Sequence, residues 1–202
     1  MDQQNISALA QTVLDRIFIE LEASGRHVHL TTAQAHALFG HDLTPVRPLS
    51  QPGQFLAKER VSIVGPKGKF HNVAVLGPVR KEGQVEISLT DGKTLGITPA
   101  IRASGDITGT PGIVLCAEQG TVALQQGVIA ARRHLHLTPD TAAHFGVRDK
   151  QTVRLQTFTD RPVIFDDVLV RVSADFADRA HLDYDEANAC AMKTGDLGRI
   201  LP

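Results

Sequence analysis

Arg26-His27-Val28-His29-Leu30-Thr31 returns later in the chain as Arg133-His134-Leu135-His136-Leu137-Thr138, and this repeat determines the architecture that we predict. On a β-strand, residues i and i+2 point to the same face, so each His-x-His sequence predicts two imidazoles on one strand face. Such a pair is well suited to bind a divalent metal. Both copies continue with an alanine and a Phe-Gly pair: Ala35 with Phe39-Gly40, and Ala142 with Phe145-Gly146. The sequence therefore predicts two related halves, each with a metal-binding strand.

The repeat extends to a third ligand position in each half. Residues 72–75 (Asn-Val-Ala-Val) align without a gap with residues 167–170 (Asp-Val-Leu-Val). The same register places Glu86 at the position of His181. Each half therefore offers His-x-His and a third residue that can bind a divalent metal. The predicted ligand sets are His27, His29 and Glu86 in the first half, and His134, His136 and His181 in the second.

Three protein ligands that leave one coordination position open are typical of catalytic zinc rather than structural zinc. The alternative is that these are scattered histidines on two related strands, with no metal. Two copies, each with a third candidate in register, favour the metal sites.

Composition limits the function classes. The length of 202 residues and the internal repeat predict two small domains. A net charge of −1, few aromatic residues and no tryptophan argue against a nucleic-acid partner. The only cysteines, Cys116 and Cys190, predict reduced thiols in a cytosolic protein and no disulfide framework, with metal ligation by them left open. No secretory signal is visible, and charged residues interrupt the apolar N-terminal pattern, so no membrane partner is expected.

Short strands dominate the predicted secondary structure. Apolar residues alternate from Ile17 onwards, which predicts a strand leading into the first His-x-His. Each His-x-His precedes a predicted short helix, at 32–38 and 139–144, with Thr31 and Thr138 as N-caps. Many short strands separated by turn residues predict a mainly β protein built of small barrels or sandwiches. Residues 105–112 are rich in glycine and predict a linker or crossover. Further predicted strands are 60–64, 73–76, 84–88, 153–156 and 168–172.

The N-terminal residues have a different period. Over residues 4–16 the apolar side chains recur at helical spacing, which predicts an amphipathic helix. A helix of this length is not stable alone in water, so its apolar face needs a partner. One candidate partner is this protein's own barrel. The other is a separate protein surface onto which the helix docks.

Arg80 is the candidate anion-binding residue. Gly77 and Pro78 predict the end of a strand and a turn, so Arg80 is held near the start of the next strand, six residues before Glu86. A guanidinium near a metal pair forms a two-pronged contact with phosphate or carboxylate. The alternative is that Arg80 is a charge facing the solvent.

Eight short motifs follow one another along the chain: Arg-His-Val-His-Leu at 26–30, Leu49 with Gln51-Pro52-Gly53-Gln54, Gly-Pro-Lys-Gly at 65–68, Leu-Gly-Pro-Val-Arg at 76–80, Gln-Val-Glu-Ile-Ser at 84–88, Gly-Thr-Pro-Gly-Ile at 109–113, the ten residues 127–136, and Asp-Glu-Ala-Asn-Ala at 185–189. In this order they resemble the PduL-type phosphotransacylases, the phosphate propanoyltransferase family of bacterial microcompartments. The resemblance runs from about Ile17 to the C-terminus. One departure precedes the first His-x-His: family members often have Val-Ser-Asn-Arg where this chain has Ala23-Ser24-Gly25-Arg26.

The resemblance implies a fold of two tandem pseudo-symmetric β-barrel domains with short capping helices and a two-zinc site between them. The corresponding expectation is an N-terminal amphipathic helix at 1–16, a first barrel at 17–108 and a second barrel at 109–202. The implied activity interconverts an acyl-CoA and phosphate with an acyl phosphate and free CoA. The expected enzyme is a phosphate propanoyltransferase or phosphate acetyltransferase, acting on propanoyl-CoA or acetyl-CoA.

The resemblance also implies a role for each site residue. His27, His29 and Glu86 would bind one zinc, whose remaining position takes the CoA sulfur. His134, His136 and His181 would bind the second zinc, which a water completes. Arg80 would hold phosphate and Ser104 would line the site. Cobalt or another divalent ion can replace zinc with such ligands.

The implied partners are acyl-CoA, phosphate, further copies of the chain in a homo-oligomer, and microcompartment shell or cargo proteins that the N-terminal helix would contact. The implied location is a microcompartment lumen involved in propanediol degradation, with the free cytoplasm as the alternative. Two other functions stay open: a dinuclear zinc hydrolase with a metal-bound hydroxide, and a non-catalytic, zinc-stabilised scaffold. An acyl-carrying role for Cys116 or Cys190 is a lesser alternative.

Overall fold

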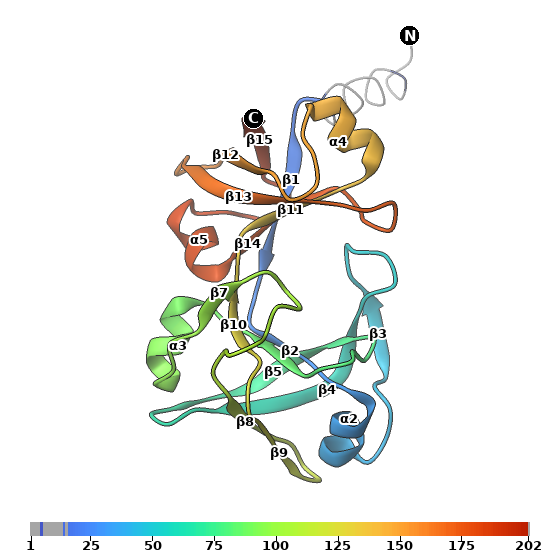
Figure 1. Ribbon diagram of the computed structural model, residues 1–202, viewed down its shortest axis with the longest axis vertical. Coiled ribbons are helices and arrows are strands. Elements are labelled where there is room, and N and C mark those ends of the chain that lie inside the picture. Colours follow the sequence, from blue (N-terminus) through green and yellow to red (C-terminus); the bar gives the residue numbers. More distant parts are fainter. Residues whose placement is uncertain (1–4, 6–13, 15, 202) are drawn as a thin grey trace. The chain divides into compact units, whose positions relative to one another are not determined.

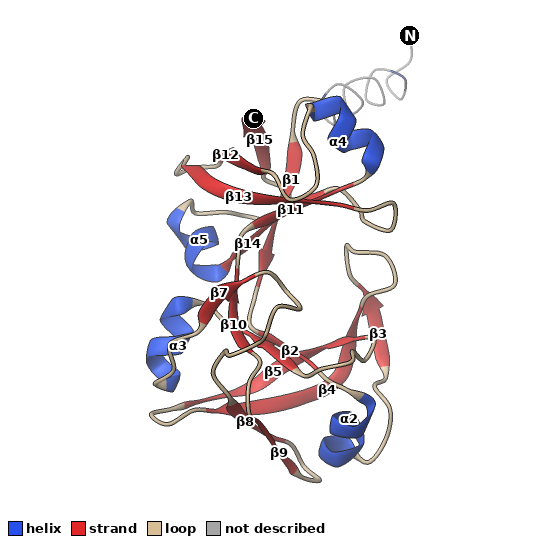
Figure 2. Ribbon diagram, in the orientation of Figure 1, coloured by secondary structure: helices blue, strands red, loops and turns tan. Residues whose placement is uncertain are grey.

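The computed structural model describes residues 5, 14 and 16–201, and strands make up most of its regular structure (Figure 2). The described residues form two compact units. The barrel unit comprises Met1–Ala23, Arg133–Leu182 and Glu186–Pro202, as far as these residues are described. The sheet unit comprises Ser24–Arg132 and Asp183–Asp185.

The barrel unit contains a closed six-stranded barrel (Figure 1). The order around it is β1-β14-β11-β13-β12-β15, and antiparallel pairing of β1 with β15 closes it. Leu135, Leu155 and Leu182 are completely buried in its core, as the inward positions of alternating strands should be. The strands are β1 (Ile19–Ser24), β11 (His134–Leu137), β12 (Thr152–Phe158), β13 (Ile164–Val172), β14 (Arg179–Asp183) and β15 (Leu197–Leu201), with helix α4 (Pro139–Phe145). Helix α5 (Tyr184–Ala189) begins in the sheet unit and continues in the barrel unit from Glu186.

The sheet unit contains a nine-stranded sheet. Eight strands follow the order β7-β10-β6-β2-β5-β4-β8-β9, and β3 pairs with β4. Val28, Ile63 and Leu115 are buried in its core. The strands are β2 (His27–His29), β3 (Pro45–Pro48), β4 (Phe55–Val64), β5 (Lys69–Gly77), β6 (Gln84–Glu86), β7 (Ala100–Arg102), β8 (Ile113–Cys116), β9 (Thr121–Leu124) and β10 (Val128–Ala131), with helices α2 (Thr32–Phe39) and α3 (Leu89–Leu95).

The two His-x-His strands have the same neighbours in the same register. In the sheet unit, His27 pairs with Ala74 of the parallel strand β5 and with Glu86 of the antiparallel strand β6. In the barrel unit, His134 pairs with Leu169 of β13 and with His181 of β14 in the same two senses. Glu86 and His181 therefore occupy equivalent positions, as the alignment of the two halves predicted.

The helix after each His-x-His begins at the predicted residue and ends one residue later than predicted, at Phe39 and at Phe145. The side chains of Thr31 and Thr138 accept hydrogen bonds from backbone N–H groups three residues later, so both threonines are N-caps. Gly40 and Gly146 end the helices in the left-handed conformation, at φ values of 78° and 67°. Only glycine adopts this conformation readily, which explains the Phe-Gly pair in each half.

The compact units do not follow the chain linearly. Strand β1 contributes to the closed barrel, but the next strand, β2, lies in the sheet unit. Likewise β10 lies in the sheet, and the next strand, β11, lies in the barrel. Residues 105–112, which the sequence predicts as a linker, lie within the sheet unit, where the hydroxyl of Thr110 accepts a hydrogen bond from Gly127 N. The predicted domain limits, 17–108 and 109–202, group the strands differently from these compact units. Whether each predicted domain folds as a unit stays a prediction.

The amphipathic helix predicted at 4–16 lies outside the described residues, apart from single positions. Of the helices in the described part of the chain, none combines the length and apolar character that crossing a bilayer requires.

Candidate metal centres

The first predicted ligand set comes together on two adjacent strands of the sheet unit. His27 and His29 lie on β2 and Glu86 lies on β6, and all three are buried. The two Nε2 atoms are 3.1 Å apart, and Glu86 Oε1 lies 3.6 Å from His27 Nε2 and 3.9 Å from His29 Nε2. Tetrahedral zinc with bonds of about 2.0–2.1 Å separates its ligand atoms by about 3.3 Å. This arrangement therefore fits a metal ion with little rearrangement.

The tautomer of His27 also suits a metal ligand. Its Nδ1 lies 2.8 Å from the carbonyl oxygen of Gly25, and a carbonyl can only accept a hydrogen bond. Nδ1 therefore donates, and in the neutral imidazole the lone pair lies on Nε2, the atom nearest to His29. A hydrogen bond of this kind from the other ring nitrogen is common in metal-binding histidines, where it fixes the ring.

The electrostatics of the first set favour the charge states that a metal needs at two of its three residues, Glu86 and His29. Burial would raise the pKa of Glu86, but the neighbouring His27 and His29 outweigh burial and hold that pKa below its ordinary value. Burial, together with the positive charges of His27 and Arg80, holds the pKa of His29 well below its ordinary value. Burial would also lower the pKa of His27, but the Glu86 carboxylate raises it instead. Glu86 and His29 can therefore bind a cation without first losing protons, whereas His27, whose pKa is raised, has to release its proton when it binds.

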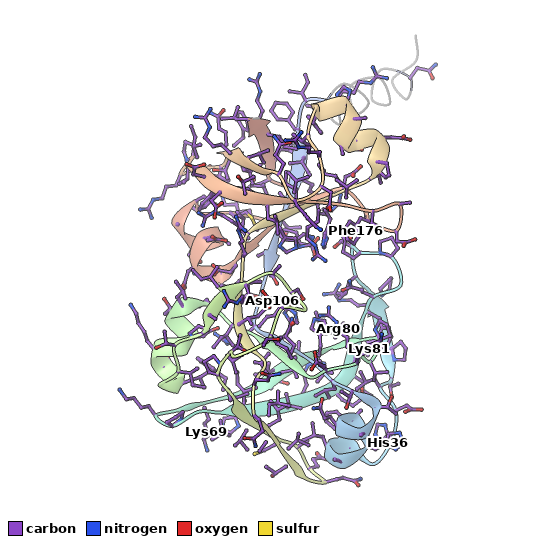
Figure 3. All side chains as sticks on the ribbon, in the orientation of Figure 1. His36, Lys69, Arg80, Lys81, Asp106 and Phe176 are labelled. Atoms are coloured by element: carbon purple, nitrogen blue, oxygen red, sulfur yellow. The ribbon has the colours of Figure 1, made fainter. Side chains whose placement is uncertain are left out.

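The second predicted set comes together in the barrel unit. His134 and His136 on β11 and His181 on β14 each offer one ring nitrogen, and these atoms lie within 4.8 Å of one another. The His136 ring packs on Phe176, which Figure 3 labels, with the centroids 4.2 Å apart. Arg171 Nη1 lies 3.3 Å from His136 Nε2 and donates to it. Three imidazoles suit zinc, copper or cobalt, so these residues also fit a metal ion.

The structure joins Arg80 and Ser104 to the first set. Arg80, labelled in Figure 3, is half-buried, and its backbone N–H donates to Leu30 O at 2.8 Å. Its Nη1 donates to Ser104 Oγ at 3.0 Å, and Ser104 Oγ donates to Glu86 Oε1 at 2.8 Å. The guanidinium is thus held two hydrogen bonds away from a candidate metal ligand. This geometry favours an anion-binding role for Arg80 over a charge that faces the solvent.

Gln84 is a site residue that the sequence analysis missed. It is buried on β6, and its Nε2 donates to Glu86 Oε1 at 2.6 Å and to Ser104 Oγ at 2.9 Å. A signal for it existed in the sequence, because Gln84 and Glu86 are two residues apart and therefore share a strand face.

Both His-x-His strands are preceded by an arginine held between a carboxylate and a phenyl ring. Arg26 forms two hydrogen bonds with Asp91, Nε to Oδ2 at 3.0 Å and Nη2 to Oδ1 at 2.7 Å, and lies over the ring of Phe70. Arg133 likewise donates to Glu186 Oε1 at 2.7 Å and lies over Phe165. These arginines anchor the start of each ligand strand to a neighbouring helix, α3 or α5.

Replacing Asp91 with alanine should destabilise the fold by about 2–3 kcal/mol, because a partly buried guanidinium loses a two-pronged partner. Asp91 also belongs to the capping box of α3 with Ser88, which the change removes. Urea unfolding measures the effect. Asp160→Ala is the control, since Asp160 pairs with Lys193 on the exposed surface and should change the unfolding free energy little. Equal unfolding midpoints for the two variants would show that the Arg26 contact contributes no stability.

This chain is similar to known proteins of one family over most of its length. Residues 20–193 match the family model described as phosphate propanoyltransferase. The phosphate propanoyltransferase of Listeria monocytogenes is 52% identical over 207 residues, covering 100% of this chain and 97% of the relative. That of Clostridioides difficile is 48% identical, with 97% of each chain covered. That of Thermotoga maritima is 55% identical over 181 residues, covering 88% of this chain and 86% of the relative.

The described residues form a mainly β fold with two clusters of residues that could hold a metal ion. The chain belongs to the phosphate propanoyltransferase family and is a phosphotransacylase. Membership sets aside the non-catalytic scaffold as its function.

Proposed function

We propose that this enzyme interconverts a short-chain acyl-CoA and phosphate with an acyl phosphate and free CoA, at a site that holds two zinc ions per chain. The acyl group is propanoyl or acetyl. The observation that carries the proposal is the pair of three-ligand clusters at equivalent strand positions, one of which is hydrogen-bonded through Ser104 to Arg80. His27, His29 and Glu86 hold one ion, and His134, His136 and His181 hold the other.

In the forward reaction, a phosphate oxygen attacks the thioester carbonyl, a C–O bond forms, and the C–S bond breaks to release CoA thiolate. Bound zinc supplies a Lewis acid and a soft partner for sulfur. Phosphate must approach a carbonyl that gains negative charge, so its own charge has to be offset. Arg80 binds phosphate through two parallel hydrogen bonds from its planar guanidinium and orients it for attack. Ser104 accepts a hydrogen bond from Arg80 Nη1 and so fixes the direction of the guanidinium.

The product distinguishes this reaction from zinc-dependent hydrolysis. The enzyme is incubated with propanoyl-CoA and excess phosphate, and acyl phosphate is trapped as a hydroxamate while free CoA is measured as thiol. We expect equal amounts of acyl phosphate and CoA. Release of CoA with free carboxylate and no acyl phosphate would favour the hydrolase instead. Acetyl-, propanoyl- and butanoyl-CoA compared side by side give the acyl preference, since one methylene contributes about 1–3 kcal/mol of discrimination.

We further propose that the two units are pseudo-symmetric copies of one barrel. Within the sheet unit, the order β10-β6-β2-β5-β4-β8 corresponds strand for strand to β1-β14-β11-β13-β12-β15. Asn72 and Asp167, which the alignment pairs, both adopt positive φ, at 57° and 55°. On this proposal, the two copies exchange one strand. Strand β1 precedes the His-x-His strand β2 of the sheet unit but belongs to the barrel, and β10 precedes β11 of the barrel but belongs to the sheet.

The N-terminal segment is proposed to be an encapsulation element that also supports a homo-oligomer. Its apolar residues recur at helical spacing, and the first barrel strand begins only at Ile19. Such a segment would direct the enzyme to a microcompartment lumen by binding a shell or cargo protein.

Deleting residues 1–15 should leave turnover close to that of the full chain, reduce self-association and abolish delivery to the lumen. Sedimentation measures the change in self-association, and co-purification with isolated microcompartments measures delivery. Val13→Glu should act like the deletion because it places a charge on the apolar stripe, whereas Gln11→Glu on the polar side should not. A truncated enzyme that unfolds or is inactive would place the segment in the core.

A further inference from the structure

Gln84 makes hydrogen bonds that a residue serving only to fill space in the core would not make. Only 2% of its surface is exposed. Its Nε2 donates to Glu86 Oε1 and to Ser104 Oγ, at 2.6 and 2.9 Å. Its Oε1 accepts a hydrogen bond from the backbone N–H of Gly105 at 2.8 Å. One amide therefore contacts a candidate metal ligand, the serine that holds Arg80, and the backbone next to that serine.

These partners allow only one orientation of the amide. A carboxylate accepts hydrogen bonds, and a backbone N–H donates them. A reversed amide would place an oxygen against Glu86 and an NH₂ group against Gly105 N, so both contacts would become repulsive. Ser104 is equally constrained, because its hydroxyl donates to Glu86 and accepts from both Arg80 and Gln84. A hydroxyl has one proton and two lone pairs, and these three contacts use them all.

The equivalent position in the barrel unit is different. Gln84 pairs across the strands with His29, and Arg179 pairs in the same way with His136. Arg179 forms an ion pair with Glu20 at 3.1 Å. The difference fits the ligands, since the first set contains Glu86 where the second contains His181. A guanidinium at position 84 would form an ion pair with Glu86 and compete with a metal ion, whereas a neutral amide donates to the carboxylate and leaves its charge available.

We propose that Gln84 is a positioning residue that couples the first metal centre to the phosphate-binding group. It holds the Glu86 carboxylate in place for the metal, and through Ser104 and Gly105 it holds the segment that directs Arg80. The proposal rests on the proposed function, because the metal and the phosphate are those named there. It follows that zinc affinity at the first centre and the phosphate requirement depend on the same amide, while the second centre does not.

The experiment measures zinc affinity at each centre separately, by competition with a chromophoric chelator and without turnover. The first centre is measured in a His134→Ala background and the second in a His27→Ala background. Gln84→Met keeps the size of the side chain but removes all three hydrogen bonds. We expect it to weaken zinc binding at the first centre by about 10–100-fold, as is usual when a partner of a metal ligand is lost. Zinc binding at the second centre should not change.

Gln84→Glu separates positioning from packing. It adds a carboxylate beside Glu86, so zinc binding at the first centre should be at least as tight as in the parent, because the ion offsets the added charge. The KM for phosphate, measured in the otherwise unchanged enzyme, should rise more than tenfold, because the new charge repels the anion near Ser104 and Arg80. Gln84→Met should therefore weaken zinc binding at the first centre, whereas Gln84→Glu should not. If Gln84 only filled space, Gln84→Met, which keeps the size of the side chain, would leave zinc affinity at the first centre unchanged.

Unchanged zinc affinity at the first centre in Gln84→Met would overturn the proposal, as would equal loss at both centres. Thermal unfolding of each variant with and without zinc identifies a folding defect. If Gln84→Met does not fold, Gln84→Glu still provides a test, because its carboxylate retains an acceptor for the Gly105 N–H. The chelator titration needs no reaction, so it tests Gln84 even if the wild-type enzyme makes no acyl phosphate. Absence of acyl phosphate would contradict the proposed function but not the role of Gln84.

Discussion

Replacing His134 with alanine is expected to remove one metal ion per chain and to lower turnover by about 10³-fold or more, with the fold intact. His134 lies opposite His181 across β11 and β14, and their rings stack with centroids 5.0 Å apart. Its loss leaves two imidazoles, too few to hold zinc firmly. A bound metal typically contributes several kcal/mol to charge stabilisation in the transition state, which corresponds to the expected loss of rate.

Metal analysis, turnover and circular dichroism of His134→Ala give the three readouts. His144→Ala is the matched control, because His144 is an exposed histidine of the same unit whose Nε2 lies 2.8 Å from Arg16 O. The control should keep two metal ions and full turnover. A His134→Ala enzyme that retains both ions, or turns over at the wild-type rate, would remove the second cluster from the mechanism.

Replacing Arg80 with alanine is expected to raise the KM for phosphate and to lower kcat. Charged hydrogen bonds contribute about 1.5–3 kcal/mol, so the loss in kcat/KM for phosphate should be about 10–100-fold. Arg80→Lys should recover little of this, because an ammonium cannot reproduce the planar two-pronged contact.

Initial rates at varied phosphate and saturating acyl-CoA measure the effect. Lys81→Ala is the control, since Lys81 is an exposed cation adjacent in sequence and should leave the KM for phosphate near its wild-type value (labelled in Figure 3). If Arg80→Ala had the same phosphate dependence as Lys81→Ala, Arg80 would be an ordinary surface charge.

The two residue clusters that could hold a metal ion could be predicted because they depend on local geometry and on a repeat. The spacing of His27 and His29 places both on one strand face in any sheet. Glu86 could be assigned because the second half provides His181 in the same register, which fixes the neighbouring strand without a three-dimensional structure. The capped helices were predictable for the same reason, since Thr31 and Gly40 act within a few residues.

The contacts that support these ligands could not be predicted in this way. Gln84 acquires its role from Ser104 and Gly105, about 20 residues further along the chain and outside its strand. Asp91 reaches Arg26 across 65 residues. Nor does local sequence reveal which sheet a strand joins, because β1 would show the same alternation in either unit. The sequence therefore predicted the strand but not its place in the closed barrel.

The central claim is that each active chain holds two divalent metal ions, one at each cluster. The most direct measurement is elemental analysis of freshly purified, active enzyme, combined with native mass spectrometry to count ions per chain. We predict two zinc or similar ions per chain, loss of turnover when a chelator removes them, and recovery when zinc or cobalt is returned. Full turnover with one metal ion per chain, or with none, would contradict the claim.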